Sequence, residues 1–525
     1  MMSINCIRDL IEKASVICPE KIAIVDGHKQ LTYKELFRKV NQVARYFTEL
    51  NLPSGARIGI YSHKSSEQII AILAMLSTEY IFVPISRLLK PEQVEHIIND
   101  CDIACIITDK AKIKSIDEIT YRGKIVTYEA IERDIVSFEE IYKCCSDAFT
   151  CTILDYKNAA ITYSFGVTGF PRGVVITHRN LIDSARVVSS YLNLQEDDVI
   201  SGILPFIVDY GLNQIFCTIY KHATLALHSL VLSADFFNHV IHDKVTIIPC
   251  MPPHITQMFE GDQKRLPHPK LLTHVRIVTS SGGKITPKMI GDIEERFTSA
   301  KFYSMHGLTE AFRSTYLDPE QLKIRPNSIG KPIPGVEIHV LNEEGNECKV
   351  REVGELIHRG GYIYKGFWKS KEDTQKRFKS IQILKNCVNL EGDLTDEIVV
   401  ASGDFVYRDE EGYLYFVCRK DDMIKVGGFR ISPIEIESVV HERLLGIKTC
   451  AVFSIENEKS EEEIVMVYTA AREISKNEIL FELKEHLPNH MIPSIVVYKE
   501  KLPYLGTNEA KIDKDALKKE VLELR

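Results

Sequence analysis

The sequence lacks the features that mark several common classes of protein. None of its 13 cysteines falls in a C-x2-C spacing, and Cys144 and Cys145 are adjacent, so they indicate neither a zinc site nor a disulfide framework. We expect buried free thiols instead. The apolar stretch from Ile69 to Leu76 is far shorter than the ~20 residues that cross a membrane. The N-terminal region carries charges every few positions, unlike a signal peptide, so we expect a soluble cytoplasmic protein without a membrane span.

An excess of basic charge is also missing. The chain has 65 Lys and Arg against 73 Asp and Glu, a formal net charge of -8, so no positive field is available to attract a nucleic acid. Its 525 residues, 45% of them apolar, exceed the roughly 100 to 200 residues of one domain, and no internal repeat divides them. These properties favour a multidomain globular protein that acts on a small molecule.

Short β-rich apolar runs alternate with longer segments of helical periodicity through most of the chain. The runs include residues 58–61, 104–108, 159–165 and 246–250, and the helical segments include 31–52 and 64–76. This alternation predicts βαβ units and largely parallel sheets. From about residue 330, Gly and charged turns separate short strands, which indicates a β-rich subdomain.

A charged stretch from Arg419 to Asp422 opens a final segment with its own expected strands (450–454 and 464–469) and helices (433–444 and 477–486). We therefore expect an α/β protein with a large N-terminal domain, residues 1–420, built from βαβ-type sheets. Its β-rich subdomain spans about 330–420. Residues 421–525 form a small α+β C-terminal domain.

The segment 159–178 carries a candidate phosphate-binding turn. Gly166, Gly169 and Gly173 lie within eight residues, with hydroxyl side chains and the cation of Arg172 beside them. Glycine backbone N–H groups can approach a polyphosphate without a Cβ in the way. The segment has no G-x4-G-K-[ST] motif and is predicted to run from strand to strand, so a plain hairpin is the alternative.

The same segment resembles the phosphate loop of adenylate-forming enzymes, the superfamily of acyl-CoA synthetases, peptide-synthetase adenylation domains and luciferases. The family pattern T-S-G-S-T-G-x-P-K-G is matched at Ser164, Gly166, Thr168, Gly169, Pro171, Arg172 and Gly173. The resemblance implies that the phosphates of ATP bind to Ser164, Gly166, Thr168, Gly169 and Arg172. Phe165 and Val167 stand where hydroxyl residues are usual, so two donors are missing.

Residues 305–310, Met-His-Gly-Leu-Thr-Glu, resemble the family's x-Y-G-x-T-E segment. The resemblance implies that His306 covers the adenine, Thr309 contacts phosphate and Glu310 holds Mg2+, and Gly282 joins the ATP-binding set. A carboxylate beside a triphosphate is repelled unless a cation bridges them, which agrees with magnesium. From the residues alone, the alternative is a Thr-Glu pair that caps a helix.

Residues 402–405 and 418–437 extend the resemblance. It implies that Asp404 accepts hydrogen bonds from both ribose hydroxyls, with help from Arg419, and that Arg430 also binds ATP. Asp421 is then the hinge of a mobile C-terminal domain, and Gly428 lines the tunnel of the thiol acceptor. Cys418 replaces the usual Gly.

Residues 502–514 resemble the family's L-P-x-T-x-N-G-K-I-D-R, with a longer spacing after Pro503 and Ala510 in place of Gly. Lys511 matches the lysine that bridges the substrate carboxylate and the α-phosphate. With Glu310 and Thr309 it forms the expected catalytic set, and the implied cofactors are ATP and Mg2+.

The acid-binding pocket of the family begins at a segment that here spans 204–214. Acyl-CoA synthetases commonly show F-H-x-x-G there, whereas amino-acid adenylation domains show F-D, whose Asp pairs the substrate ammonium. Asp209 takes that position, and a carboxylate in an apolar pocket is costly unless a cation pairs it. The alternative is that Asp209 caps the following turn, and some fatty-acyl-AMP ligases also carry Asp here.

The run F-x-x-D-Y-G-L-N-Q also resembles stand-alone ligases that load proline onto carrier proteins, so L-proline is the specific expectation. The expected pocket is completed by Tyr210, Asn213, Ser281, Met305 and Ser314. We find no carrier-protein segment in the chain, so the thiol acceptor is expected to be a separate carrier protein or coenzyme A. Two alternatives stay open: an acyl-CoA synthetase for a fatty or aryl acid, and a non-catalytic adenylate-binding protein.

Overall fold

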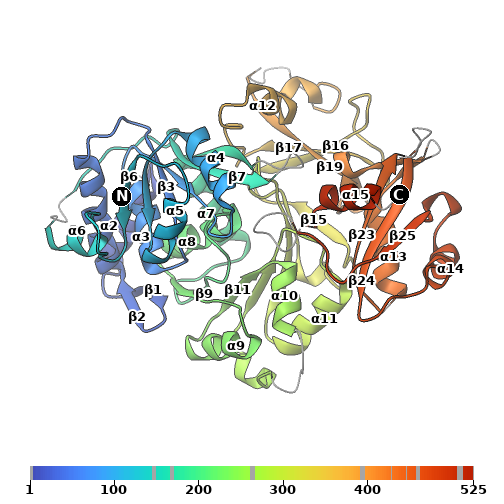
Figure 1. Cartoon of the computed structure of the whole chain (residues 1–525), viewed down its shortest axis with the longest axis horizontal. Coiled ribbons are helices and arrows are strands. Elements are labelled where there is room, and N and C mark those ends of the chain that lie inside the picture. The colour runs from blue at the N-terminus through green and yellow to red at the C-terminus, as the bar shows by residue number, and fades with distance from the viewer. Residues whose placement is uncertain are drawn as a thin grey trace.

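The structure, a computed structural model, describes residues 4–144, 149–165, 171–259, 266–388, 390, 396–426, 429–444, 446–456, 462–504 and 512–523. It confirms the predicted α/β fold, with two large sheets, two small ones and helices packed on them (Figure 1). The cysteines that it describes are free thiols. Within these ranges no helix is both long enough and apolar enough to cross a membrane.

The first sheet has six strands in the order β6-β5-β3-β4-β7-β8. All neighbours are parallel except β7 and β8, which form an antiparallel hairpin. The central strands are almost entirely buried, as expected of parallel strands covered on both faces. The bounds are β3 Arg57–Tyr61, β4 Ile81–Pro84, β5 Ile103–Thr108, β6 Lys124–Thr127, β7 Asn158–Phe165 and β8 Pro171–Thr177.

The second sheet has 14 strands and changes character along its length. Its parallel part runs β1-β10-β9-β11-β12-β13, with β2 antiparallel at the outer edge of β1. From β13 the sheet continues through antiparallel pairs, β14-β15-β20-β19-β17-β16, and β18 joins the side of β19.

The bounds of these strands are β1 Ile22–Asp26, β2 Lys29–Thr32, β9 Val199–Ser201, β10 Thr224–Leu227, β11 Ile247–Cys250, β12 Ile277–Ser280, β13 Lys301–His306, β14 Thr315–Leu317, β15 Ser328–Pro332, β16 Val336–Leu341, β17 Gly354–Gly360, β18 Phe378–Ser380, β19 Ile398–Arg408 and β20 Leu414–Arg419. The switch from parallel to antiparallel pairing falls at the turn between β13 and β14. That turn carries the Thr309-Glu310 motif.

Helix α3 (Ser66–Met75) packs between the two sheets, because it contacts β3 and β4 of the first and β1 of the second. It is apolar around most of its circumference, as such a position requires. The other helices of this region are α1 Ile7–Ile17, α2 Tyr33–Glu49, α4 Pro91–Cys101, α5 Ile113–Asp117, α6 Phe138–Cys144, α7 His178–Tyr191, α8 Asp209–Lys221, α9 Ser233–His242, α10 Pro252–Phe259, α11 Pro287–Arg296 and α12 Lys371–Arg377.

The helix predicted over residues 31–52 is shorter than expected. Leu31 belongs to strand β2, where it pairs with Ile24 of β1. The Thr32 hydroxyl accepts the Glu35 N–H while the Glu35 carboxylate accepts the Thr32 N–H, so this capping box starts the helix at Tyr33. Chain pairing at the sheet edge therefore overrides the helical periodicity of the first residues.

The last hundred residues pack around their own buried side chains. A hairpin, β21 (Ile424–Val426) and β22 (Phe429–Ile431), precedes a three-stranded sheet of β23 (Ile447–Glu456), β24 (Glu462–Ala470) and β25 (Ile495–Tyr498). One apolar cluster lies under α13 (Pro433–Arg443) and α14 (Lys476–His486), and a second lies under α15 (Lys514–Glu523). Figure 1 shows this part, in orange and red, at one end of the molecule.

Candidate nucleotide and acid site

The phosphate-loop candidate is the connection of the β7–β8 hairpin, as the strand-to-strand prediction required. Gly166, Thr168 and Gly169 lie outside the described residues, and Ser164 is described only through its backbone, which pairs with Arg172. The Arg172 guanidinium donates from Nη1 to Oδ1 of Asp373 at 3.1 Å. Arg172 therefore has a carboxylate partner on α12, which the sequence did not indicate.

Asp404 forms the centre of the best-defined cluster of predicted residues. Its side chain is 2% exposed, its Oδ1 accepts from Arg419 Nη1 at 2.5 Å, and its Oδ2 lies 3.1 Å from His306 Nε2. Burial alone raises the pKa of the carboxyl, but His306 and Arg419 outweigh it and hold the pKa below its usual value. The three residues come from β13, β19 and β20, so the antiparallel half of the second sheet brings them together.

The backbone at Gly403 explains how Asp404 is presented. Gly403 has φ +69°, and a Cβ there would lie 1.9 Å from Nη1 of Arg377. The Ser402 hydroxyl accepts the N–H of Asp404 at 2.9 Å and donates to the carbonyl of Leu356 at 2.7 Å. The S-G-D sequence thus lets the chain turn under an arginine while it fixes the carboxylate.

Thr309 and Glu310 lie in the turn between β13 and β14. No helix begins there, so the helix-capping alternative is wrong for this part of the chain, which the structure describes in full. Burial raises the pKa of the Glu310 carboxyl, whereas Arg377 and Arg419 act against it. Thr309 is exposed, and the Glu310 carbonyl accepts the N–H of Tyr364 at 3.0 Å.

The Glu310 carboxylate is a suitable ligand for Mg2+. No described basic side chain forms an ion pair with it, and the described residues contain no group of three or more His, Cys, Asp or Glu side chains that could hold a metal. Mg2+ bound to a nucleotide typically takes one or two protein carboxylates and completes its shell with phosphate oxygens and water. A single carboxylate without an ion-pair partner among the described residues fits that pattern.

The expected acid pocket is built around the start of α8. Asp209 is the first residue of this helix, and its Oδ1 accepts the N–H of Tyr210 at 2.7 Å, so it does satisfy part of the helix N-terminus, as the capping alternative proposed. Burial nevertheless raises the pKa of the Asp209 carboxyl. Gly211 is required here because a Cβ would lie 1.9 Å from the carbonyl oxygen of Pro205.

The other predicted pocket residues are engaged with the surrounding protein. The Tyr210 hydroxyl lies 2.6 Å from the hydroxyl of Thr279 on β12, and Met305 Sδ accepts from the Tyr191 hydroxyl at 3.1 Å. Asn213 donates to the Ser184 hydroxyl at 3.0 Å, which joins α8 to α7. Asn213 is therefore bound into the packing of two helices.

Ser314 is held by a buried histidine. Its hydroxyl lies 3.0 Å from Nδ1 of His358, whose Nε2 lies 3.0 Å from the carbonyl oxygen of Gly361. Burial lowers the pKa of His358 to about 4, so the ring is neutral near pH 7. A carbonyl only accepts, so Nε2 carries the proton and Nδ1 accepts from Ser314.

One charged residue of this region was missed in the sequence. Arg313 is 3% exposed, and its Nη1 donates to the hydroxyl of Ser281 at 2.7 Å. Its guanidinium carbon lies 4.8 Å from the centre of the Tyr210 ring. Arg313 is the only charged residue between Ala311 and Leu317, and this interruption of an uncharged run was the signal that could have identified it.

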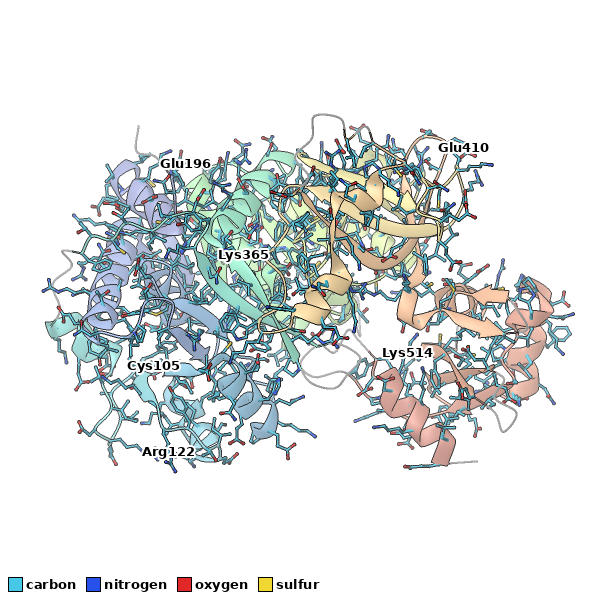
Figure 2. All side chains as sticks on the ribbon, turned by 90° about the horizontal axis from the view of Figure 1, so that it is seen from above. Cys105, Arg122, Glu196, Lys365, Glu410 and Lys514 are labelled. Carbon is cyan, nitrogen blue, oxygen red and sulfur yellow. The ribbon has the colours of Figure 1, made fainter. Side chains whose placement is uncertain are left out.

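The C-terminal candidates are only partly described. Lys511 and Gly428 lie outside the described residues, and Asp421 and Arg430 are described only through their backbone, in a short 3-10 turn (Lys420–Asp422) and in β22. Lys514, labelled in Figure 2, donates to Glu437 Oε1 at 3.2 Å and to the carbonyl of Val452 at 2.9 Å. Across to the N-terminal part, Lys284 donates to the hydroxyl of Ser438 on α13.

Comparison with known proteins finds matches over nearly the whole chain. The family model described as AMP-binding enzyme matches residues 11–368. Tyrocidine synthase 1 of Brevibacillus parabrevis is 25% identical over 519 residues, which cover 97% of this chain and 44% of that protein. Gramicidin S synthase 1 of Brevibacillus brevis is 24% identical over 516 residues, again 97% of this chain and 44% of the relative. The chain thus spans less than half the length of these two relatives.

Solved structures share the fold over nearly the full chain. ATP-bound MatB from Rhodopseudomonas palustris has a TM-score of 0.85 at 21% identity and covers 98% of this chain and 99% of its own. The o-succinylbenzoate coenzyme A synthetase MenE from Bacillus subtilis, in complex with ATP and magnesium, has a TM-score of 0.82 at 22% identity, with 97% and 99% covered.

Proposed function

The chain belongs to the family of AMP-binding enzymes, and from that premise we propose that it adenylates an amino acid and transfers it to the phosphopantetheine thiol of a separate carrier protein. Enzymes of this superfamily activate a carboxylic acid with ATP and Mg2+. The amino-acid part of the proposal rests on Asp209, the carrier-protein part on the synthases found among the relatives.

Asp209 is the observation that carries the choice of an amino acid. Its carboxylate is partly buried at the start of α8, burial raises its pKa, and among the described residues no basic side chain forms an ion pair with it. A carboxylate in such surroundings is stabilised when a cation pairs it. The ammonium group of an amino acid supplies that cation, whereas a fatty or aryl acid does not.

The nucleotide would bind across the antiparallel half of the second sheet. Both oxygens of Asp404 keep free lone pairs after their contacts with His306 and Arg419, so they can accept the two ribose hydroxyls. The ring of His306 lies beside Phe416, with centroids 5.9 Å apart, and offers a face to the adenine. Ser164, Gly166, Thr168, Gly169, Arg172 and Gly282 are the proposed phosphate contacts.

The first step is an in-line attack of the substrate carboxylate on the α-phosphate, which expels pyrophosphate. Mg2+, when bound at Glu310, neutralises charge on the phosphates. Thr309 would hold a phosphate oxygen, and Lys511 would bridge the attacking carboxylate and the α-phosphate. No protein nucleophile is required, because positioning and charge stabilisation account for this type of transfer.

In the second step, we propose that residues 421–525 rotate as a domain about Asp421. The rotation would withdraw Lys511 and bring Gly428 to the tunnel through which the thiol enters. The Lys284–Ser438 contact then belongs to one of two arrangements, and it would break during the cycle. Coenzyme A is the alternative acceptor, because the MenE structure of the same fold is a coenzyme A synthetase.

The test is ATP–pyrophosphate exchange with Asp209→Asn, using L-proline, the candidate from the Phe206–Gln214 run, within a panel of amino acids. Each amino acid is compared with its desamino analogue, for example cyclopentanecarboxylate for proline. Asp209→Asn should weaken use of the best amino acid about 10²-fold or more, because a charge-assisted contact in a buried site is lost. The desamino analogue should lose much less in the variant.

Asp235→Asn is a matched control, because Asp235 lies in the first turn of α9 as Asp209 does in α8. It should leave both acids unchanged. Near-zero coupling between residue 209 and the amino group in this double-mutant cycle would exclude the pairing. Exchange with fatty or aryl acids alone would support the acyl-CoA synthetase, and no exchange with any acid would support the non-catalytic alternative.

A further inference from the structure

We infer that the activated acid carries a second anionic group, a side-chain carboxylate, and that Arg313 binds it. The inference rests on the proposed function, since it names which amino acids enter the pocket that begins at Asp209. It makes Arg313 a determinant of specificity, and it favours amino acids with acidic side chains over proline.

Arg313 is a buried cation that forms no direct ion pair with any described residue. Its contacts include the hydroxyl of Ser281, at 2.7 Å from Nη1, and the side chain of Tyr191, which is also hydrogen-bonded to it. The rings of Tyr210 and Phe312 lie with their centres 4.8 Å and 5.1 Å from the guanidinium carbon. Its Nε has no hydrogen-bond acceptor, and no described carboxylate lies within 4.0 Å of the guanidinium.

A guanidinium in this position remains positively charged. Arginine keeps its proton in proteins, so burial leaves a full positive charge that neutral hydroxyls and aromatic faces compensate only in part. A carboxylate is the natural complement, because it accepts from two guanidinium N–H groups at once. The Nε–H of Arg313 is available for such an acceptor.

The charge lies within the expected acid pocket. Arg313 contacts two of the residues predicted to line it, Tyr210 and Ser281. Its charge also acts on Asp209, where it opposes the rise in pKa that burial causes. No hydrogen bond or ion pair joins these two described residues, so the expected pocket would hold a carboxylate and a guanidinium that are both incompletely paired.

This arrangement matches one class of substrate. In an amino acid with an acidic side chain, the α-ammonium would pair Asp209, the α-carboxylate would face the α-phosphate, and the side-chain carboxylate would reach Arg313. Proline satisfies the first two contacts and leaves Arg313 unpaired. The competing account is that Arg313 only offsets the charge of Asp209, in which case neutral acids would be preferred.

Isosteric pairs of amino acids test the inference. L-aspartate is compared with L-asparagine, and L-glutamate with L-glutamine, in ATP–pyrophosphate exchange with the full chain. We expect at least one acidic amino acid to exceed its amide about 100-fold in kcat/KM. Arg313→Met should reduce this preference to within a few-fold, and Arg313→Lys should restore part of it. The KM for ATP should stay unchanged in both variants.

Arg296→Met is the matched control, because Arg296 is also buried, has an Nε without an acceptor and donates to the carbonyl of Pro267 outside the pocket. It should keep the preference for acidic side chains. A wild-type preference for the amides or for proline, or a preference that Arg313→Met leaves intact, would overturn the inference. If no acid supports exchange, the proposed function fails. The role of Arg313 in binding is then tested by calorimetric titration of wild type and Arg313→Met with L-glutamate and L-glutamine. Equal binding by the two proteins overturns that role.

Discussion

Replacing Asp404 with Asn should weaken ATP binding far more than it impairs use of the acid. The substitution keeps the shape of the side chain but removes the charge that Arg419 and His306 contact at 2.5 Å and 3.1 Å. It also puts an amide N–H2 where one of these donors expects an acceptor. If the two ribose hydroxyls bind Asp404 as proposed, they lose a charged partner together.

The magnitude follows from the number of hydrogen bonds to a charged group. Each is worth about 1.5 to 3 kcal/mol, so two lost contacts amount to about 3 to 6 kcal/mol. At about 1.4 kcal/mol per factor of ten, the Kd for ATP should rise by a factor of about 10² to 10⁴. Calorimetric titration measures it directly, and the KM for ATP in pyrophosphate exchange should follow.

Asp198→Asn provides the control. Asp198 is as buried as Asp404, with a side chain 2% exposed, and it also accepts from an arginine, Arg276, at 2.7 Å from Nε. Both variants should lose stability, but only Asp404→Asn should lose ATP affinity. The cycle closes with 2′-deoxy- and 3′-deoxy-ATP: if the deoxynucleotides lose as much affinity in Asp404→Asn as in the wild type, the ribose does not contact this carboxylate.

Two further predictions concern Lys511, the proposed catalytic lysine, and the dependence of stability on pH. Lys511→Ala should reduce adenylate formation by about 10²-fold or more while it spares transfer from a chemically supplied aminoacyl adenylate, and equal loss of both half-reactions in a folded variant would contradict its role. Burial lowers the pKa of His358 from 6.5 to about 4. Between these pH values the unfolded chain binds a proton at this residue and the folded protein does not, so the protein should become less stable as the pH falls from 6.5 to 4. Above pH 6.5 the contribution of His358 to stability is fully present. The contribution of His358 to the free energy of unfolding is about 3 kcal/mol. Urea unfolding at pH 7 and pH 4 should therefore show a smaller loss of this free energy in His358→Asn than in the wild type. An identical loss in the two proteins would refute the prediction.

Motif order in the sequence singled out three distant residues that the structure brings together. His306, Asp404 and Arg419 are separated by up to 113 residues, yet the structure joins them through two ion-pair contacts. Short apolar runs also located strands such as β3, β5 and β7, because buried parallel strands need nearly continuous apolar sequence. The first residues of α2 were misassigned because pairing at a sheet edge is not a local property.

The missed features depend on burial and long-range pairing. Arg172 was assigned to phosphate without its partner Asp373, which lies 201 positions along the chain. Arg313 was passed over since a charged residue is ordinarily solvated, and only the three-dimensional packing shows that it is 3% exposed. Asp209 was singled out in the sequence as a candidate pocket residue. The raised pKa of its carboxyl follows from its burial in the folded protein, which a residue pattern does not reveal.

The position of Arg419 has a consequence for timing. Arg419 holds Asp404 from the last position of β20, and the chain enters the short turn 420–422 with the next residue. A nucleotide that strengthens the contact between Arg419 and Asp404 would therefore restrict the backbone at residues 420–422, from which the C-terminal region begins. If Asp404 binds the ribose and Asp421 is the hinge, as proposed, ATP would restrict the hinge before any acid binds, and an ordered mechanism with ATP first would follow.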